Sequence, residues 1–201
     1  MSVQQRQSPW ISPEEYLEGE KISQVRHEYV DGEVYAMAGA SRTHSLISGN
    51  IFAAFHSHLR GMPCEAHSND MKARIEHRNI FYYPDVFVTC DPRDLDAEDY
   101  SRFPKVIVEV LSPTTASIDR DAKLRDYQSL VSVDEYVLVS QDEPRIEAFR
   151  RRDGGCWEYR LYTSEEDFRF ESLDLRIPMD QVYEKVRFGA TGRNASQVRG
   201  I

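Results

Sequence analysis

The chain has 201 residues, of which 40% are hydrophobic and 29% are charged. This composition can bury the core of one domain and excludes a wholly disordered chain. Thirty-four acidic residues against 25 basic ones give a formal net charge of −9, which counts against non-specific binding of nucleic acids through their phosphates. A bound divalent cation would reverse that field locally.

Cysteine usage and hydropathy bear on the compartment of the protein. Cys64, Cys90 and Cys156 are scattered and form no C-x-x-C pair, so we expect three reduced thiols rather than a zinc site or a disulfide framework. The N-terminus lacks the apolar core of a signal peptide, and no apolar run approaches the roughly 20 residues that cross a bilayer. We therefore expect a cytoplasmic protein with no membrane partner.

The first part of the chain predicts a helix, a hairpin and a longer helix. Ser12 followed by Glu15 forms a capping box that starts a short helix. Residues 27–37 contain two β-rich runs around Asp31-Gly32, a favoured two-residue turn. Apolar residues then recur at intervals of four over residues 43–59, which predicts an amphipathic helix.

The rest of the chain is predicted to mix strands with one helix. Strand-like runs, a helix and further strands follow in order at residues 64–75, 80–90, 105–111, then 117–130, then 135–140, 145–150, 157–162 and 168–173. We expect the acidic loop 91–102 to be solvated. The order predicts an α/β fold, a mixed β-sheet flanked by helices, with an added N-terminal hairpin and added C-terminal strands. Residues 1–188 should form one domain, and residues 189–201 a flexible tail.

Two acidic side chains stand within predicted strands. Asp85 follows Pro84 inside an aromatic and β-branched run, and Glu109 is the only polar residue of Val106–Leu111. Continuous apolar runs belong to strands buried on both faces, where a carboxylate is costly unless it is paired, hydrogen-bonded or bound to metal. The sequence leaves two alternatives open: a surface Asp85 on a half-exposed strand, and a buried Glu109 paired to an Arg or Lys.

Carboxylates on neighbouring strands suit Mg²⁺ or Mn²⁺, because these ions prefer hard oxygen ligands. Such an ion lowers the pKa of bound water and stabilises charge on a scissile phosphate. On the predicted helix 117–130, Asp119, Lys123 and Tyr127 are spaced by four and share one face. Lys123 could hold an attacking hydroxide or offset charge in the transition state. The alternative is an ordinary surface pair of Asp119 and Lys123.

Four further residues are weaker candidates. Glu33, just after the hairpin turn, could add a third carboxylate to a metal or could be an ordinary hairpin-edge residue. His44, at the start of the second helix, could contact phosphate, orient a ligand or cap the helix. Asp70 and Lys72 are expected on one face of the strand 64–75, either supporting the site or forming an exposed face.

Taken together, these residues resemble the Uma-two-like family of predicted restriction endonucleases, part of the PD-(D/E)XK superfamily. The resemblance covers about residues 12–186 and depends on the order and spacing of its fragments. These are Tyr29-Val-Asp-Gly-Glu33, His44, Tyr83-Pro-Asp-Val86, Val108-Glu-Val-Leu-Ser-Pro113, Thr115, Asp119, Lys123, Tyr127 and Glu135-Tyr136.

The resemblance implies a restriction-endonuclease-like core, Mg²⁺-dependent hydrolysis and a homodimer. By this likeness Asp85 and Glu109 take the places of the two metal-binding acids, and the backbone carbonyl of Val110 adds a ligand. Glu33 matches an acidic position of the family. Leu111 is a departure, because the superfamily has a Lys two residues after the second acid. Lys123 matches the place to which this family has moved that charge.

We therefore predict a metal-dependent endonuclease that hydrolyses phosphodiester bonds of DNA, with Mg²⁺-bound water as the nucleophile. The catalytic and metal-binding residues are expected to be Asp85, Glu109, Val110, Lys123 and Glu33, with support or substrate contacts from His44, Asp70, Lys72 and Tyr127. The alternative is a non-catalytic nucleic-acid-binding or assembly module with a degenerate nuclease fold, which the net charge and Leu111 favour. The sequence also leaves open the choice between DNA and RNA.

Overall fold

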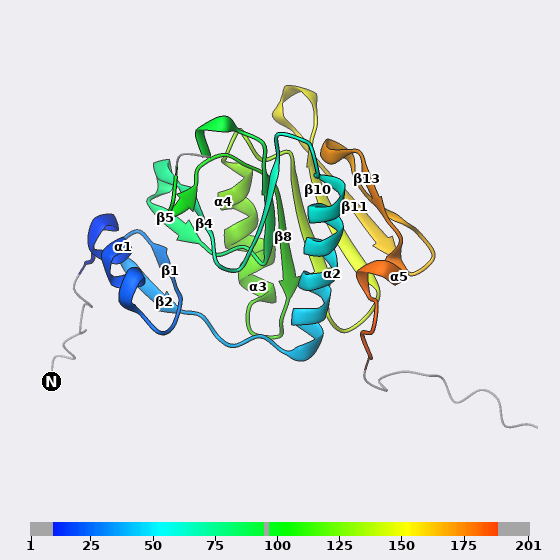
Figure 1. The fold of residues 1–201 in the computed structure, drawn as a ribbon, viewed down its shortest axis with the longest axis horizontal. Coiled ribbons are helices and arrows are strands. Elements are labelled where there is room, and N and C mark those ends of the chain that lie inside the picture. The colour runs from blue at the N-terminus through cyan, green and yellow to red at the C-terminus, as the bar shows by residue number, and fades with distance from the viewer. Residues whose placement is uncertain (1–9, 95–96, 189–201) are drawn as a thin grey trace, which may run out of the picture.

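The computed structural model describes residues 10–94 and 97–188, in which β-strands outnumber helices (Figure 1). The helices are α1 (Pro13–Ile22), α2 (Arg42–His58), α3 (Ala116–Ile118), α4 (Leu124–Gln128) and α5 (Met179–Val182). The strands are β1 (His27–Val30), β2 (Glu33–Ala36), β3 (Glu65–Ser68), β4 (Lys72–Ile75), β5 (Ile80–Tyr82), β6 (Val86–Thr89), β7 (Tyr100–Ser101), β8 (Pro104–Leu111), β9 (Glu135–Ser140), β10 (Arg145–Arg151), β11 (Trp157–Thr163), β12 (Phe168–Phe170) and β13 (Leu175–Ile177). In this part of the chain no helix has the length and apolar character needed to cross a membrane.

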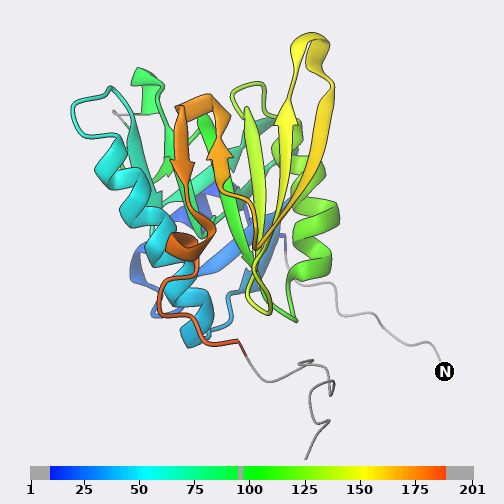
Figure 2. The ribbon, with the colours of Figure 1, turned by 90° about the vertical axis from the view of Figure 1, so that its right-hand side faces the viewer.

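The strands form two main sheets and a small one. One sheet has the order β2-β1-β5-β4-β7, the other has the order β11-β10-β9-β8-β6-β3, and β12 pairs with β13. In the six-stranded sheet β8 runs parallel to β9 and antiparallel to β6, so the sheet is mixed, as predicted. Figure 2 shows α2 on one side of this sheet and the α3–α4 segment on the other.

Each face of the six-stranded sheet buries an apolar layer. Ile47, Ile51 and Phe55 of α2 pack with strand residues such as Val86 and Val108. On the opposite face, Tyr127 of α4 packs with Ile107 and Leu138. The uninterrupted apolar run of β8 follows from this arrangement, because both of its faces are covered.

Local sequence signals set the N-terminal elements. The Ser12 side chain caps α1 and the Glu15 side chain bonds back to the Ser12 backbone, so the predicted capping box is confirmed. Asp31 and Gly32 adopt positive φ values of 45° and 95° between β1 and β2, as the predicted two-residue hairpin turn requires. The helix predicted at 43–59 is also confirmed, as α2.

Two predicted strands are wrong in extent, because each one bends between the two sheets. The run 64–75 divides into β3, which pairs with β6, and β4, which pairs with β5. The run 80–90 divides into β5 and β6 at Tyr83-Pro84-Asp85. Pro84 has no backbone N–H for a ladder, so the strand is interrupted there. The result is one bent hairpin that belongs to both sheets.

Two further expectations need correction, the one for the cysteines and the one for the loop 91–102. Cys64 and Cys90 form a disulfide, because the pairing of Glu65 with Thr89 sets the two cysteines opposite each other with Cα atoms 4.1 Å apart; Cys156 is free and exposed. The loop 91–102 is not wholly solvated, since Asp94 is buried there and accepts hydrogen bonds from the hydroxyls of Thr89 (2.6 Å) and Ser101 (2.5 Å).

The C-terminal part of the chain also differs from its prediction. The strand expected at 168–173 ends at Phe170 and continues as a 3₁₀ turn, and β13 and α5 were not predicted. The predicted flexible tail, residues 189–201, lies outside the described residues.

Candidate active site

The register of two central strands sets Asp85 opposite Glu109. β6 and β8 are antiparallel, and Val86 pairs with Val108, so the preceding Asp85 faces the following Glu109 on the same side of the sheet. The Asp85 backbone N–H donates to Glu109 Oε2 over 3.3 Å. Only 9% of Asp85 and 3% of Glu109 are exposed. Two carboxylates therefore lie side by side in the core of the sheet.

Asp85 is held in place by a backbone amide and a histidine. The Val110 N–H donates to Asp85 Oδ2 over 2.7 Å, and His44 Nε2 lies 3.0 Å from the same oxygen. His44 reaches this position from the first turn of α2, which Ser41 caps. Burial alone would lower the pKa of His44, but the hydrogen bond and charge of Asp85, with help from Asp119 and the Val110 carbonyl, raise it.

The Lys123 ammonium lies among three carboxylates. Lys123 Nζ is 2.8 Å from Glu28 Oε1, 3.2 Å from Glu109 Oε1 and 3.6 Å from Asp119 Oδ1. Residues 119–123 form a π-helical turn between α3 and α4, which differs from the continuous helix that we predicted. Such turns are rare and frequently occur at functional sites. Here the turn directs Asp119 and Lys123 into the same buried space.

Acidic groups outnumber basic groups in this cluster, which consists of Glu28, His44, Asp85, Glu109, Asp119 and Lys123. Burial raises the pKa of Glu109 well above its ordinary value; Lys123 opposes the shift, and Asp85, Asp119 and Glu28 add to it. Burial opposes the charged form of Lys123, but Glu109, Glu28 and Asp119 together raise the pKa of Lys123. The surroundings therefore favour the charged form of Lys123 and disfavour the ionised form of Glu109.

The donor set of the cluster fits Mg²⁺ through few protein ligands. Within residues 10–94 and 97–188, no group of three or more His, Cys, Asp or Glu side chains is arranged to hold a metal ion. Mg²⁺ commonly uses one or two carboxylates and keeps several waters, which matches Asp85 and Glu109 with the Val110 carbonyl beside them. In the same part of the chain the buried Asp119 Oδ1 and His44 Nδ1 have no hydrogen-bond partner, so the cluster has unused polar capacity.

Glu28 contacts Lys123 and belongs to this cluster, whereas Glu33 does not. Glu33 is exposed at the start of β2 and accepts a hydrogen bond from the Tyr35 hydroxyl. No hydrogen bond or ion pair between described residues joins Glu33 to Lys123 or its acids. Glu28 was not among the predicted residues. Strand alternation could have indicated it, because Tyr29 is fully buried against Tyr16 and Phe81 and its neighbour must face the other side.

Asp70 and Lys72 do not share a strand face, contrary to prediction. Asp70 is exposed in the turn between β3 and β4 and pairs with Arg26. Lys72 begins β4 and is buried, with its ammonium 5.2 Å from the centre of the Tyr83 ring. Burial lowers the pKa of Lys72. These two residues are therefore separated by the bend that divides the predicted strand.

Tyr127 forms part of the apolar wall beside the cluster. Its ring is fully buried and lies 5.6 Å from the Tyr82 ring and 5.3 Å from the Tyr136 ring, between centroids. Its hydroxyl has no hydrogen-bond partner among the described residues. Burial and the nearby Glu109 raise the pKa of Tyr127 well above its ordinary value, so this phenol stays neutral.

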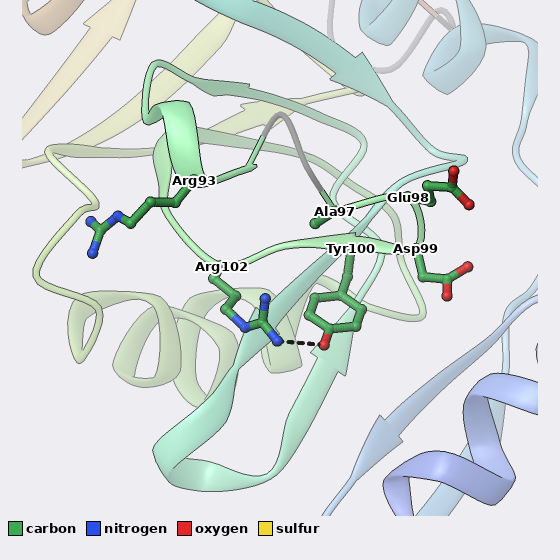
Figure 3. A pocket seen from close by; sticks show the side chains of 6 residues that line it. All are labelled: Arg93, Ala97, Glu98, Asp99, Tyr100 and Arg102. Atoms are coloured by element: carbon green, nitrogen blue, oxygen red, sulfur yellow. Dashed lines mark hydrogen bonds between the residues drawn. The ribbon is translucent and has the colours of Figure 1, made fainter.

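A surface hollow of about 280 Å³ lies apart from the cluster (Figure 3). Its lining mixes basic and acidic side chains and contains none of the cluster residues. The lining residues are Arg93, Ala97, Glu98, Asp99, Tyr100 and Arg102. Arg102 bonds to the Tyr100 hydroxyl over 2.7 Å and Arg93 pairs with the Asp91 carboxylate, so both guanidinium groups of the hollow are already engaged.

The sequence matches a known family over most of its length. Residues 13–181 match the family model Uma2, described as "Putative restriction endonuclease". The chain is 38% identical to an uncharacterised protein of Synechocystis sp. over 180 residues, covering 90% of this chain and 95% of that protein. It is 28% identical to a second uncharacterised Synechocystis protein over 149 residues, covering 73% of this chain and 84% of the relative.

The fold also has a counterpart among solved structures. A crystal structure from Anabaena variabilis, described as a putative nuclease belonging to DUF820, superposes with a TM-score of 0.69. The superposition covers 86% of this chain and 97% of that chain at 16% sequence identity. Similarity at this level of identity concerns the fold, and it confirms the predicted nuclease-like α/β architecture. The family match likewise confirms the resemblance inferred from the sequence.

Proposed function

The chain belongs to the Uma2 family of putative restriction endonucleases, and from this premise we propose that it is a metal-dependent endonuclease that hydrolyses phosphodiester bonds of DNA. The observation that carries the proposal is the buried pair of Asp85 and Glu109, set opposite each other by the β6–β8 register. The cluster around this pair has more carboxylates than cations, which favours binding of a divalent ion. Mg²⁺ is the proposed ion, with Mn²⁺ as a substitute.

The chain supplies orientation and charge for this reaction. When bound, Mg²⁺ would lower the pKa of a water molecule and offset charge on the scissile phosphate. Asp85 and Glu109 would hold the ion with the Val110 carbonyl. The Val110 N–H and His44 fix the Asp85 carboxylate, and the Asp85 N–H fixes Glu109. Few other protein groups are needed, since phosphoryl transfer depends mainly on positioning and electrostatic stabilisation.

Lys123 is proposed to act as a fixed positive charge. Its pKa is raised by the acids around it, so it remains protonated and does not act as a general base. Its ammonium lies 3.2 Å from Glu109, close enough to the proposed ion site to offset negative charge that develops on the phosphate. Glu28 and Asp119 hold the ammonium in this position. This arrangement replaces the charge that Leu111 does not provide.

A non-catalytic nucleic-acid-binding or assembly module is the second candidate. Two observations favour it: the net charge of −9, and the burial of Glu109 and Lys123, of which only 3% and 6% are exposed. A binding module has no requirement for a divalent ion at Asp85 and Glu109. Calorimetric titration with Mg²⁺ and Mn²⁺ therefore separates the two candidates, since only the nuclease should bind the ions at this site.

A plasmid-nicking assay with Mg²⁺ or Mn²⁺ tests the nuclease directly, with an RNA substrate run in parallel. The wild type should convert supercoiled DNA to nicked and linear forms, and Asp85→Ala should lose this activity. Asp121→Ala is the matched control. Asp121 is an exposed acid on the helical segment that carries Lys123, and it pairs only with the exposed Arg125 among the described residues. Equal cleavage by Asp85→Ala and the wild type would end the assignment. Cleavage of RNA alone would change the substrate but not the site.

A further inference from the structure

The outer edge of the six-stranded sheet is formed by β11, which pairs only with β10 among the described residues. Two backbone bonds fix which groups of β11 face outward. Arg151 N–H donates to the Asp134 carbonyl on the β9 side, and Arg152 N–H donates to the Cys156 carbonyl on the β11 side, both over 2.8 Å. Because hydrogen-bonded pairs alternate along an antiparallel ladder, the N–H and C=O groups of Trp157, Tyr159 and Leu161 point away from β10.

The side chains along this edge are apolar on one face and charged on the other. Trp157, Tyr159 and Leu161 share one face, and Tyr159 and Leu161 are 51% and 39% exposed. The Tyr159 ring lies 5.1 Å from the Phe149 ring, so the apolar surface continues onto β10. Glu158 and Arg160 project from the other face, with side chains 50% and 54% exposed.

We propose that a second copy of this chain pairs with β11 in an antiparallel manner, around a two-fold axis through Tyr159. Tyr159 then lies opposite Tyr159 of the second copy, and Trp157 lies opposite Leu161 of the second copy. Each of these pairs uses outward backbone groups and exchanges both of its N–H···O bonds. The two sheets become continuous across the interface. The two β11 strands would therefore form the interface of the homodimer that the family resemblance implies.

Charge selects this register over the other symmetric ones. With the axis through Tyr159, Glu158 of each copy lies opposite Arg160 of the other. An axis through Arg160 would place two arginines opposite each other, and an axis through Glu158 would place two glutamates opposite each other, which is destabilising. An axis through Leu161 forms no opposite-charge pair. The spacing of one acid and one base two residues apart is therefore self-complementary only in the proposed register.

The charges on this edge can change partners when the interface forms. In the single chain Glu158 pairs with Arg152, and Arg160 lies 2.9 Å from Glu166. Ion pairs this exposed contribute little to stability, so exchanging them costs little. Edge strands that avoid pairing are commonly protected by charged side chains, proline or bulges, but the charges of β11 are of opposite sign and match each other in the proposed register. The seven residues of β11 contain no proline and pair regularly with β10.

Sedimentation equilibrium tests the interface with a charge-swap series. The wild type should be a dimer, and Arg160→Glu should weaken self-association by about tenfold or more, because it sets Glu158 opposite a second acid. The double variant Glu158→Arg/Arg160→Glu should restore the dimer. Arg125→Glu, an exposed reversal on α4, is the matched control. A monomeric wild type, or a dimer indifferent to Arg160→Glu, would overturn the proposal.

Cysteine cross-linking tests the register itself. In a Cys156→Ser background, Tyr159→Cys should form an intermolecular disulfide on oxidation, since opposed Cα atoms in a hydrogen-bonded pair are about 5.5 Å apart. Leu161→Cys should not, because the two copies of that residue lie on opposite sides of the axis, roughly 13 Å apart. Cross-linking through Leu161→Cys and not Tyr159→Cys would reject this register. β9 and β10 separate the edge from β8, so nuclease activity can fail without affecting this result.

Discussion

Two buried ionic clusters lie in the same sheet and differ in their balance of charge. In the first, Arg150 donates to Glu135 over 2.9 Å, to the Tyr162 hydroxyl over 2.8 Å and to the Arg169 carbonyl over 2.7 Å. The other oxygen of Glu135 accepts from the Ser172 backbone over 2.7 Å. The partly exposed Glu171 lies 3.4 Å from Arg150 and also pairs with Arg152. The buried acid and base, Glu135 and Arg150, balance each other in charge and each is further hydrogen-bonded, so this pair is complete without any ligand.

The second cluster, around Lys123, is neither balanced in charge nor fully hydrogen-bonded. The ammonium lies within 4 Å of Glu28, Glu109 and Asp119, while Asp85 has only His44 and a backbone amide as partners. The pKa of Glu109 is raised by burial and by the surrounding acids despite Lys123. Under the proposed function, the balanced buried pair maintains the fold, whereas the surplus of buried carboxylates around Lys123 is the proposed site of the cation.

The largest expected effect comes from removing one acid from each cluster. Glu109→Gln should reduce nuclease activity by about 1,000-fold, a loss of about 4 kcal/mol in transition-state stabilisation. Its free energy of unfolding without metal should not fall by more than about 1 kcal/mol, because Lys123 keeps two other acids. Glu135→Gln should instead cost about 3 kcal/mol of stability, since the buried Arg150 loses its buried counter-charge and keeps only the partly exposed Glu171.

Urea denaturation measures the free energy of unfolding of each variant, and the nicking assay measures its nuclease activity. Glu135→Gln should retain activity per folded molecule at temperatures where it stays folded. Arg125→Gln, which breaks only an exposed pair with Asp121, serves as the control for both measurements. A loss of stability in Glu109→Gln as large as that in Glu135→Gln would remove the distinction between the clusters.

Mg²⁺ should stabilise the wild type against thermal unfolding. A ligand that binds only the folded state adds about 2.7 kcal/mol at 100 times its dissociation constant. Asp85→Asn should lose this stabilisation, whereas Glu135→Gln should keep it, because only the Lys123 cluster has a surplus of acids over bases. Differential scanning calorimetry at constant ionic strength gives the comparison. An equal shift of Tm in Asp85→Asn would place the ion elsewhere in the molecule.

The dependence of Mg²⁺ affinity on pH is a smaller effect with a defined sign. The pKa of Glu109 is raised above its ordinary value of 4.5, so its contribution to metal-free stability is present below that value and is lost as pH rises through the raised pKa. Over the same interval protons stop competing for the carboxylate, so Mg²⁺ affinity should rise, by up to about tenfold per pH unit. Calorimetric titrations at a series of pH values above 4.5 measure it, and Glu109→Gln should flatten the curve.

Sequence patterns were sufficient where a continuous local signal decides the structure. The capping box of α1, the four-residue spacing in α2 and the unbroken apolar run of β8 each point to one element. Reasoning about the cost of buried charge selected Asp85 and Glu109, and helical spacing together with the family resemblance selected Lys123. The structure brings these three residues together.

Local sequence patterns could not predict the features that depend on how distant segments of the chain pack together. The bends at residues 69–71 and 83–85 transfer strands from one sheet to the other, which period-two alternation does not reveal. The disulfide of Cys64 and Cys90 depends on the register of β3 against β6. The π-helical turn at 119–123 could not be predicted either. Asp119 and Lys123 are four residues apart, a spacing that also places two side chains on one face of an α-helix.

The two glutamates of the N-terminal hairpin provide the finest test of the comparison. Glu28 lies 2.8 Å from Lys123, whereas Glu33 is exposed and contacts Tyr35. Glu28→Gln should therefore reduce nuclease activity by about tenfold, because the Lys123 ammonium loses one of the acids that position it. Glu33→Gln should change activity by less than about twofold and stability by less than about 0.5 kcal/mol, as is usual for exposed substitutions. Measuring kcat and KM separately distinguishes positioning of Lys123, which alters kcat, from DNA binding, which alters KM. If Glu33→Gln reduced nuclease activity more than Glu28→Gln, the active site would have to extend to the start of β2. The cluster around Lys123 would then be only one part of the site.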